Sequence, residues 1–188
     1  MDAFFVTLAA IAIGEIGDKT QLLSLVLAAR FRRPLPIIVG ILCATLANHA
    51  IAGAAGVWLR GLVDPRWLRW VLGFSFLAIA GWALVPDELE ADRAPPVPYG
   101  VFLVTLLAFF LAEIGDKTQL ATLMLAAKYD SVVAVVAGST LGMLIADVPA
   151  VLLASAAPGA IPLRAVRFVA AALFAVLGVA ALAGFGFA

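Results

Sequence analysis

The chain has 188 residues, of which 65% are hydrophobic and 13% are charged, and its formal net charge is zero. A soluble domain of this length cannot bury so much apolar surface, so the composition excludes an ordinary soluble protein and predicts an integral membrane protein. The balanced charge provides no basic patch for nucleic acid, and the expected surrounding is the lipid bilayer.

Polar and proline-rich segments divide the sequence into six apolar stretches. A helix needs roughly 20 apolar residues to cross the hydrocarbon core of a bilayer, and each stretch has about that length. The stretches cover residues 4–29, 35–59, 67–85, 99–127, 132–156 and 165–186. Backbone groups in lipid must be hydrogen-bonded within their own segment, so we expect helices throughout. The predicted fold is therefore all-α, with six transmembrane helices.

The second half of the chain repeats the first at a fixed offset. The octapeptide EIGDKTQL occupies residues 15–22 and again residues 113–120, which is 98 positions later. We expect two halves of three spans each, residues 1–85 and 99–188, joined by an acidic and proline-rich linker at 86–98. Three is an odd number, so the second half must enter the membrane in the opposite sense. The prediction is an inverted repeat, an arrangement typical of transporters.

Each copy of the octapeptide places two carboxylates and a lysine inside an apolar span. Unpaired charge is costly in a membrane and usually marks a functional site. If the first span is one continuous helix, Glu15, Asp18 and Lys19 share a face, because they are three and four residues apart. The inverted repeat would bring Glu15 and Asp18 to the same depth as Glu113 and Asp116. We therefore expect one shared site near the middle of the membrane.

This set of side chains is suited to a divalent metal ion. Carboxylate oxygens are hard ligands that favour Mn²⁺, Ca²⁺ or Mg²⁺, and the threonines and glutamines of the motif add neutral oxygens. The expected ligands are Glu15, Asp18, Thr20, Gln21, Glu113, Asp116, Thr118 and Gln119. Four carboxylates with Lys19 and Lys117 carry two net negative charges, which one divalent ion neutralises. Gly17 and Gly115 allow either close helix approach or local unwinding, and both alternatives stay open.

His49 and Asp147 are the other ionisable residues deep in the spans, and they occupy equivalent positions in the two halves. Either could extend the metal shell or pass protons between the site and water. The alternative is a core histidine that is hydrogen-bonded with Asn48, and an aspartate that caps a helix break at Pro149. Asn48 is expected to share the role of His49.

The doubled Glu-x-Gly-Asp-Lys-Thr motif, in a six-span chain with an acidic central loop, resembles the transmembrane protein 165 family in its bacterial form. The resemblance covers essentially the whole chain. It implies a cation/proton exchanger of Mn²⁺ or Ca²⁺, without a prosthetic group and without enzymatic activity. The residues that it implies are Glu15, Asp18, Lys19, Thr20, Glu113, Asp116, Lys117 and Thr118. The main expectation is thus a secondary antiporter that exports Mn²⁺, with Ca²⁺ as the other cation.

Two other functions are compatible with the same residues. An intramembrane aspartyl protease would use Asp18 and Asp116, although such proteases resemble Gly-x-Gly-Asp, and Glu15 and Glu113 stand where that first glycine would be. A non-transporting assembly factor would use the charges only to fasten two helices, with Lys19 and Lys117 neutralising Asp18 and Asp116.

The basic loop residues predict an orientation in the membrane. Six arginines fall in loops on one side, whereas three arginines and one lysine fall on the other. The more basic side is expected to be cytoplasmic. This places the central loop in the cytoplasm and both termini outside, in a multi-pass protein of the bacterial inner membrane.

Overall fold

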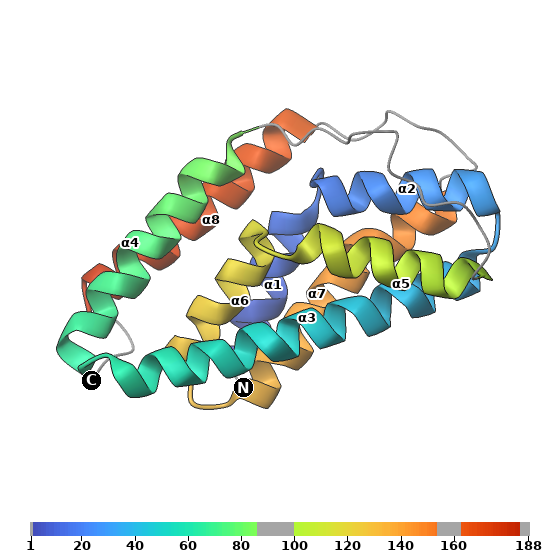
Figure 1. Ribbon diagram of the computed structural model, residues 1–188. Coiled ribbons are helices and arrows are strands. Elements are labelled where there is room, and N and C mark those ends of the chain that lie inside the picture. Colours follow the sequence, from blue (N-terminus) through green and yellow to red (C-terminus); the bar gives the residue numbers. More distant parts are fainter. Residues whose placement is uncertain (1, 86–99, 154–162, 185–188) are drawn as a thin grey trace.

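The computed structural model describes residues 2–85, 100–153 and 163–184, and the linker expected at 86–98 lies outside these ranges. All regular elements in the described ranges are α-helices (Figure 1). They are α1 (Asp2–Glu15), α2 (Lys19–Phe31), α3 (Pro34–Leu62), α4 (Pro65–Ala83), α5 (Gly100–Glu113), α6 (Lys117–Lys128), α7 (Val132–Leu153) and α8 (Leu163–Leu182).

Two of the six expected spans are divided. The stretch expected at 4–29 forms α1 and α2, and the stretch expected at 99–127 forms α5 and α6, with both divisions inside the repeated octapeptide. The helix boundaries follow the sequence repeat, because α5 begins and ends 98 residues after α1. The duplication therefore extends from the sequence to the pattern of helices.

Residues at equivalent positions of the two halves touch each other. The hydroxyl of Thr45 donates a hydrogen bond to the sulfur of Met143 at 3.2 Å, and these residues are 98 positions apart. The rings of Phe76 and Phe174, also separated by the repeat offset, stack with centroids 6.4 Å apart and an interplanar angle of 12°. A residue can contact its own equivalent only where a two-fold axis passes between them. Both contacts therefore lie on an approximate two-fold axis between the halves.

The helices that meet on this axis run antiparallel. Gly53, two turns beyond Thr45 in α3, packs against Val132 at the start of α7. In the same way Gly73, about one turn before Phe76 in α4, packs against Leu182 at the end of α8. The axis is thus roughly perpendicular to these helices. Figure 1 shows α4 and α8 side by side.

Glycines bring each half close to the other. A Cβ on Gly138 of α7 would lie 2.5 Å from the carbonyl oxygen of Phe4 in α1, and a Cβ on Gly40 of α3 would lie 3.0 Å from that of Phe102 in α5. These two contacts are equivalent under the repeat. Because only a glycine fits at such distances, they fix α1 against α7 and α5 against α3 near the start of α1 and of α5.

The outer surface is apolar. Large side chains that are exposed include Leu35, Trp58, Phe74, Val133 and Val176. Within the described ranges, α3 and α7 are each long and apolar enough to cross a bilayer. A surface of this kind is suited to lipid contact rather than to water.

The close approach at Gly138 predicts a specific loss of stability. Gly138→Ala should destabilise the protein by about 1–3 kcal/mol, because the added methyl overpacks the contact between α1 and α7. Gly81→Ala is the matched control, since at this helical position the described residues place no atom beyond the local helix within 4 Å of the added group. Thermal unfolding in detergent measures both. Equal unfolding temperatures for the two variants would contradict the packing analysis.

Candidate cation site

Both motif copies unwind at their glycine. Gly17 and Gly115 have φ angles of 81° and 75°, a region that favours glycine, and they separate α1 from α2 and α5 from α6. Asp18 then caps the start of α2, where its carboxylate accepts the N–H of Lys19 at 2.7 Å. The expectation that Glu15, Asp18 and Lys19 share one helical face was therefore wrong, because the helix is interrupted between them.

The lysine of each motif copy pairs with the aspartate of the other copy. The Nζ atom of Lys19 lies 3.0 Å from a carboxylate oxygen of Asp116, and that of Lys117 lies 3.0 Å from one of Asp18. Both aspartates are buried, so each requires such a counter-charge. The reciprocal pairs hold the two breaks face to face.

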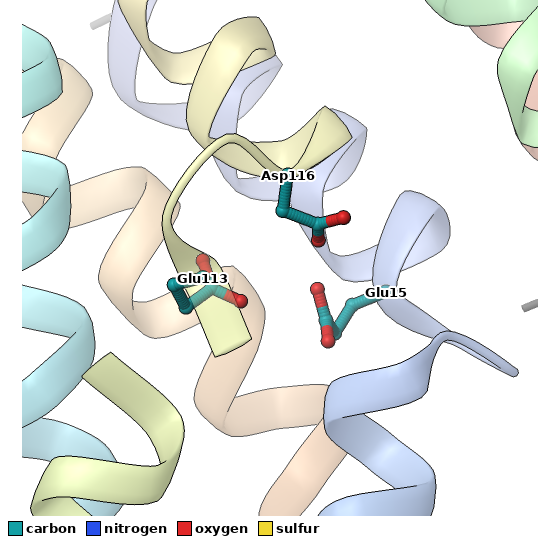
Figure 2. A group of neighbouring side chains, drawn as sticks. All are labelled: Glu15, Glu113 and Asp116. Carbon is teal, nitrogen blue, oxygen red and sulfur yellow. The ribbon is translucent and has the colours of Figure 1, made fainter. Parts of the chain in front are cut away.

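Glu15, Glu113 and Asp116 converge between the breaks. Figure 2 shows the three carboxylates pointing toward one another, Glu15 from the end of α1 and the other two from the α5–α6 break. One oxygen from each lies within 4.8 Å of the others, and all three residues are buried. Oxygens on opposite sides of a bound Ca²⁺ are about 4.6–5.2 Å apart, because Ca–O distances are about 2.3–2.6 Å. The cluster therefore has the dimensions and the chemistry of a divalent cation site.

Several of these oxygens have no hydrogen-bond partner among the described residues. Both carboxylate oxygens of Glu15 and one of Glu113 are buried and accept no hydrogen bond from a described residue. The hydroxyl of Thr118 lies 3.2 Å from Asp116 and 3.5 Å from Glu113. The equivalent hydroxyl of Thr20 is buried without a partner in the described ranges. Buried carboxylates normally have partners, so oxygens in this state are suited to a ligand.

His49 lies beside the glutamate of the opposite half: its Nε2 atom is 3.6 Å from a carboxylate oxygen of Glu113. Asp147, the repeat equivalent of His49, is fully buried, and its charge acts on both Glu15 and Glu113. α7 continues through Pro149 to its end at Leu153, so Asp147 does not cap a helix break there.

The motif glutamines are engaged at the breaks. The side-chain oxygen of Gln21 accepts the N–H of Gly17 at 2.8 Å, and that of Gln119 accepts the N–H of Gly115 at 2.7 Å. Their amide groups reach the opposite half, where one partner is the main-chain carbonyl of Ala146. The sequence analysis did not identify this carbonyl, because a main-chain acceptor leaves no mark in the residue type.

Comparisons with known proteins show the family of the chain. The profile of the family described as "Divalent cation/proton antiporter GDT1" matches residues 3–91 and 101–185. A protein of Vibrio cholerae serotype O1 described as "Putative manganese exporter" is 48% identical over 181 residues, which cover 96% of this chain and 90% of that protein. No solved structure matches the chain.

More distant relatives also match nearly the whole length of this chain. GDT1-like protein 5 of Arabidopsis thaliana is 25% identical over 97% of this chain and 96% of its own length. GDT1-like protein sll0615 of Synechocystis is 27% identical over 93% of each chain. The resemblance inferred from the doubled motif is confirmed: the chain belongs to the GDT1 family of divalent cation/proton antiporters, which are transporters and not enzymes.

Proposed function

We propose that this chain exchanges Mn²⁺ for protons across the bacterial inner membrane, and that carboxylates from both halves form the shared site. The observation that carries this proposal is the convergence of Glu15, Glu113 and Asp116 from two helix breaks. The name of the Vibrio relative favours Mn²⁺. Ca²⁺ uses the same class of ligands and is the other candidate.

The charges of the site support coupling between metal and protons. The two motif copies contribute four carboxylates and two lysines, which leaves two negative charges for a divalent ion to neutralise. Metal binds the deprotonated carboxylates, so protons and metal compete for the same oxygens. Asp147 and His49 stand next to the glutamates and are proposed to pass protons to them. Lys19 and Lys117 compensate the aspartates when the metal leaves.

The proposed layout has six spans, with α1–α2 and α5–α6 as broken spans and α3, α4, α7 and α8 as the others. Residues 1–85 and 99–188 then form two inverted repeats joined by the linker at 86–98. The antiparallel contacts on the two-fold axis support this arrangement, because such an axis lies in the membrane plane if the helices cross the membrane. We keep the central loop in the cytoplasm and both termini outside.

The packing of α4 and α8 supports two alternating states. In the described residues, α4 packs on α6 and α8 packs on α1, whereas their repeat equivalents, α8 on α2 and α4 on α5, lack comparable packing. The α4–α8 pair therefore breaks the symmetry of the other helices. Exchanging the conformations of the two halves would move this pair onto α2 and α5 and open the site to the other side.

The geometry argues against the two other functions. An aspartyl protease needs two carboxyl groups that share a proton, whereas Asp18 and Asp116 each have a lysine 3.0 Å away. A packing role would leave no reason for the unpartnered oxygens of Glu15.

Removing the charge of either glutamate should abolish exchange. In vesicles with an imposed pH gradient, Glu15→Gln or Glu113→Gln should reduce Mn²⁺ flux by roughly a hundredfold or more, because an amide neither releases a proton nor contributes charge. Asp130→Asn makes the same chemical change at an exposed residue outside the site and should keep the wild-type flux. Flux that survives both glutamate changes would show that these carboxylates are not the shared site.

The apparent affinity for Mn²⁺ should depend on pH. As the pH falls, protons occupy the glutamates and the apparent KM for Mn²⁺ should rise, by up to about tenfold per pH unit for each proton displaced. Uptake measured at several pH values with the gradient clamped gives this dependence. A constant KM from pH 8 to about pH 5 would separate proton binding from metal binding.

The two states predict different cross-links. With Cys43→Ala as background, cysteines replacing Gly14 and Phe174 should link in the state described here, because a Cβ on Gly14 lies 3.2 Å from the Phe174 ring. The repeat-equivalent pair, Ala112 and Phe76, should link only in the exchanged state. A short bifunctional thiol reagent, applied with and without Mn²⁺ at two pH values, measures both populations. Failure of the second pair to link under any condition would contradict the exchange of states.

A further inference from the structure

Each helix break leaves main-chain groups without helical partners in apolar surroundings. α5 ends at Glu113, so the carbonyl of Phe110 and the N–H of Gly115 fall among the groups that a helix cannot satisfy at its end. In a membrane no water replaces the missing partners, and side chains must supply them. The residues that do so hold the shape of the break.

In the second half, two amide side chains bridge this break. Gln119 accepts the N–H of Gly115 at 2.7 Å and donates to the side-chain oxygen of Asn48 at 3.3 Å. Asn48 in turn donates to the carbonyl of Phe110 at 3.0 Å. The three hydrogen bonds run from one side of Glu113 to the other. They connect α6 to α5 through α3, beside His49, which is the next residue in the chain.

In the first half, one glutamine makes the equivalent connection. Gln21 accepts the N–H of Gly17 at 2.8 Å and donates to the main-chain carbonyl of Ala146 at 3.0 Å. Ala146 is the repeat equivalent of Asn48 and directly precedes Asp147. Both glutamines therefore tie a break to the turn of the opposite helix that carries the auxiliary ionisable residue.

We propose that Gln21 and Gln119 are positioning residues that hold the two breaks open and set each motif glutamate against Asp147 or His49. This inference rests on the proposed cation/proton exchange. Each glutamine accepts a backbone N–H of its break and donates to the opposite half, so the proposal assigns it to placing the carboxylates and not to binding the metal. An amide is suited to this bridge, because it carries an acceptor and a donor on separate atoms of one side chain.

Replacing Asn48 distinguishes a positioning role of Gln119 from metal binding by Gln119. If the oxygen of Gln119 bound Mn²⁺, losing Asn48 would leave that oxygen in place and the apparent KM unchanged. If the amides act as one bridge, Gln119→Leu and Asn48→Leu each break it. The double variant should then have the same apparent KM as each single variant.

The experiment measures Mn²⁺ uptake by vesicles containing the full chain, with apparent KM and maximal rate determined separately. We expect Gln119→Leu and Asn48→Leu each to raise KM about tenfold, and the double variant to show the same tenfold rise and not a hundredfold one. Thr105→Val is the matched control, because it removes another helix hydrogen bond of a buried threonine, at 2.8 Å to the carbonyl of Val101 in α5, about two turns before the break. Its KM should equal that of the wild type.

A second readout does not depend on transport. Hydrogen–deuterium exchange of residues 113–118 in the purified protein should become faster in Gln119→Leu and in Asn48→Leu, but not in Thr105→Val. The inference would be overturned if Asn48→Leu left KM unchanged or if the double variant raised KM a hundredfold. Unchanged deuterium exchange of residues 113–118 would overturn it as well. Wild-type vesicles that exchange no Mn²⁺ would refute the proposed function instead, and deuterium exchange would then decide the role of the amides alone.

Discussion

The reciprocal ion pairs between the two motif copies are the interaction on which the rest of the site depends. Lys19 with Asp116 and Lys117 with Asp18 cross the approximate two-fold axis at 3.0 Å each. A charge inside apolar surroundings requires a partner, and here the partner always comes from the other half. Neither break can therefore exist alone, and the convergence of the glutamates between the breaks follows from this pairing.

Charge balance then connects structure to coupling. Because the lysines compensate the aspartates, the unneutralised charge is concentrated on Glu15 and Glu113, with Asp147 and His49 next to them. The surroundings of the two glutamates differ, since Glu113 has the imidazole of His49 at 3.6 Å, whereas the repeat equivalent of His49 is the carboxylic acid Asp147. Two halves of one ancestral repeat have thus become chemically unequal at the point where metal and protons would compete.

Much of this arrangement could be predicted from the sequence. The doubled octapeptide indicated the repeat, the pooled carboxylates and the family, because such strings are specific and their charges stand out in apolar spans. The unwinding at Gly17 remained open, since a glycine permits close packing as well as a positive φ. The exchange of lysine partners could not be predicted, because it depends on how two breaks face each other in space. The bond from Gln21 to the carbonyl of Ala146 was equally hidden, because any residue offers that acceptor.

The location of bound Mn²⁺ is the most direct test of a cation site shared by the two halves. Crystals or detergent-solubilised protein loaded with Mn²⁺ at neutral pH allow the ion to be placed by its anomalous scattering or in an experimental density map. We expect one ion between the two breaks, in contact with carboxylate oxygens from both halves, among them those of Glu15 and Glu113. This ion should be lost when the pH is lowered. An ion held by residues of one half only, or bound away from the glutamates, would contradict a site shared across the two-fold axis.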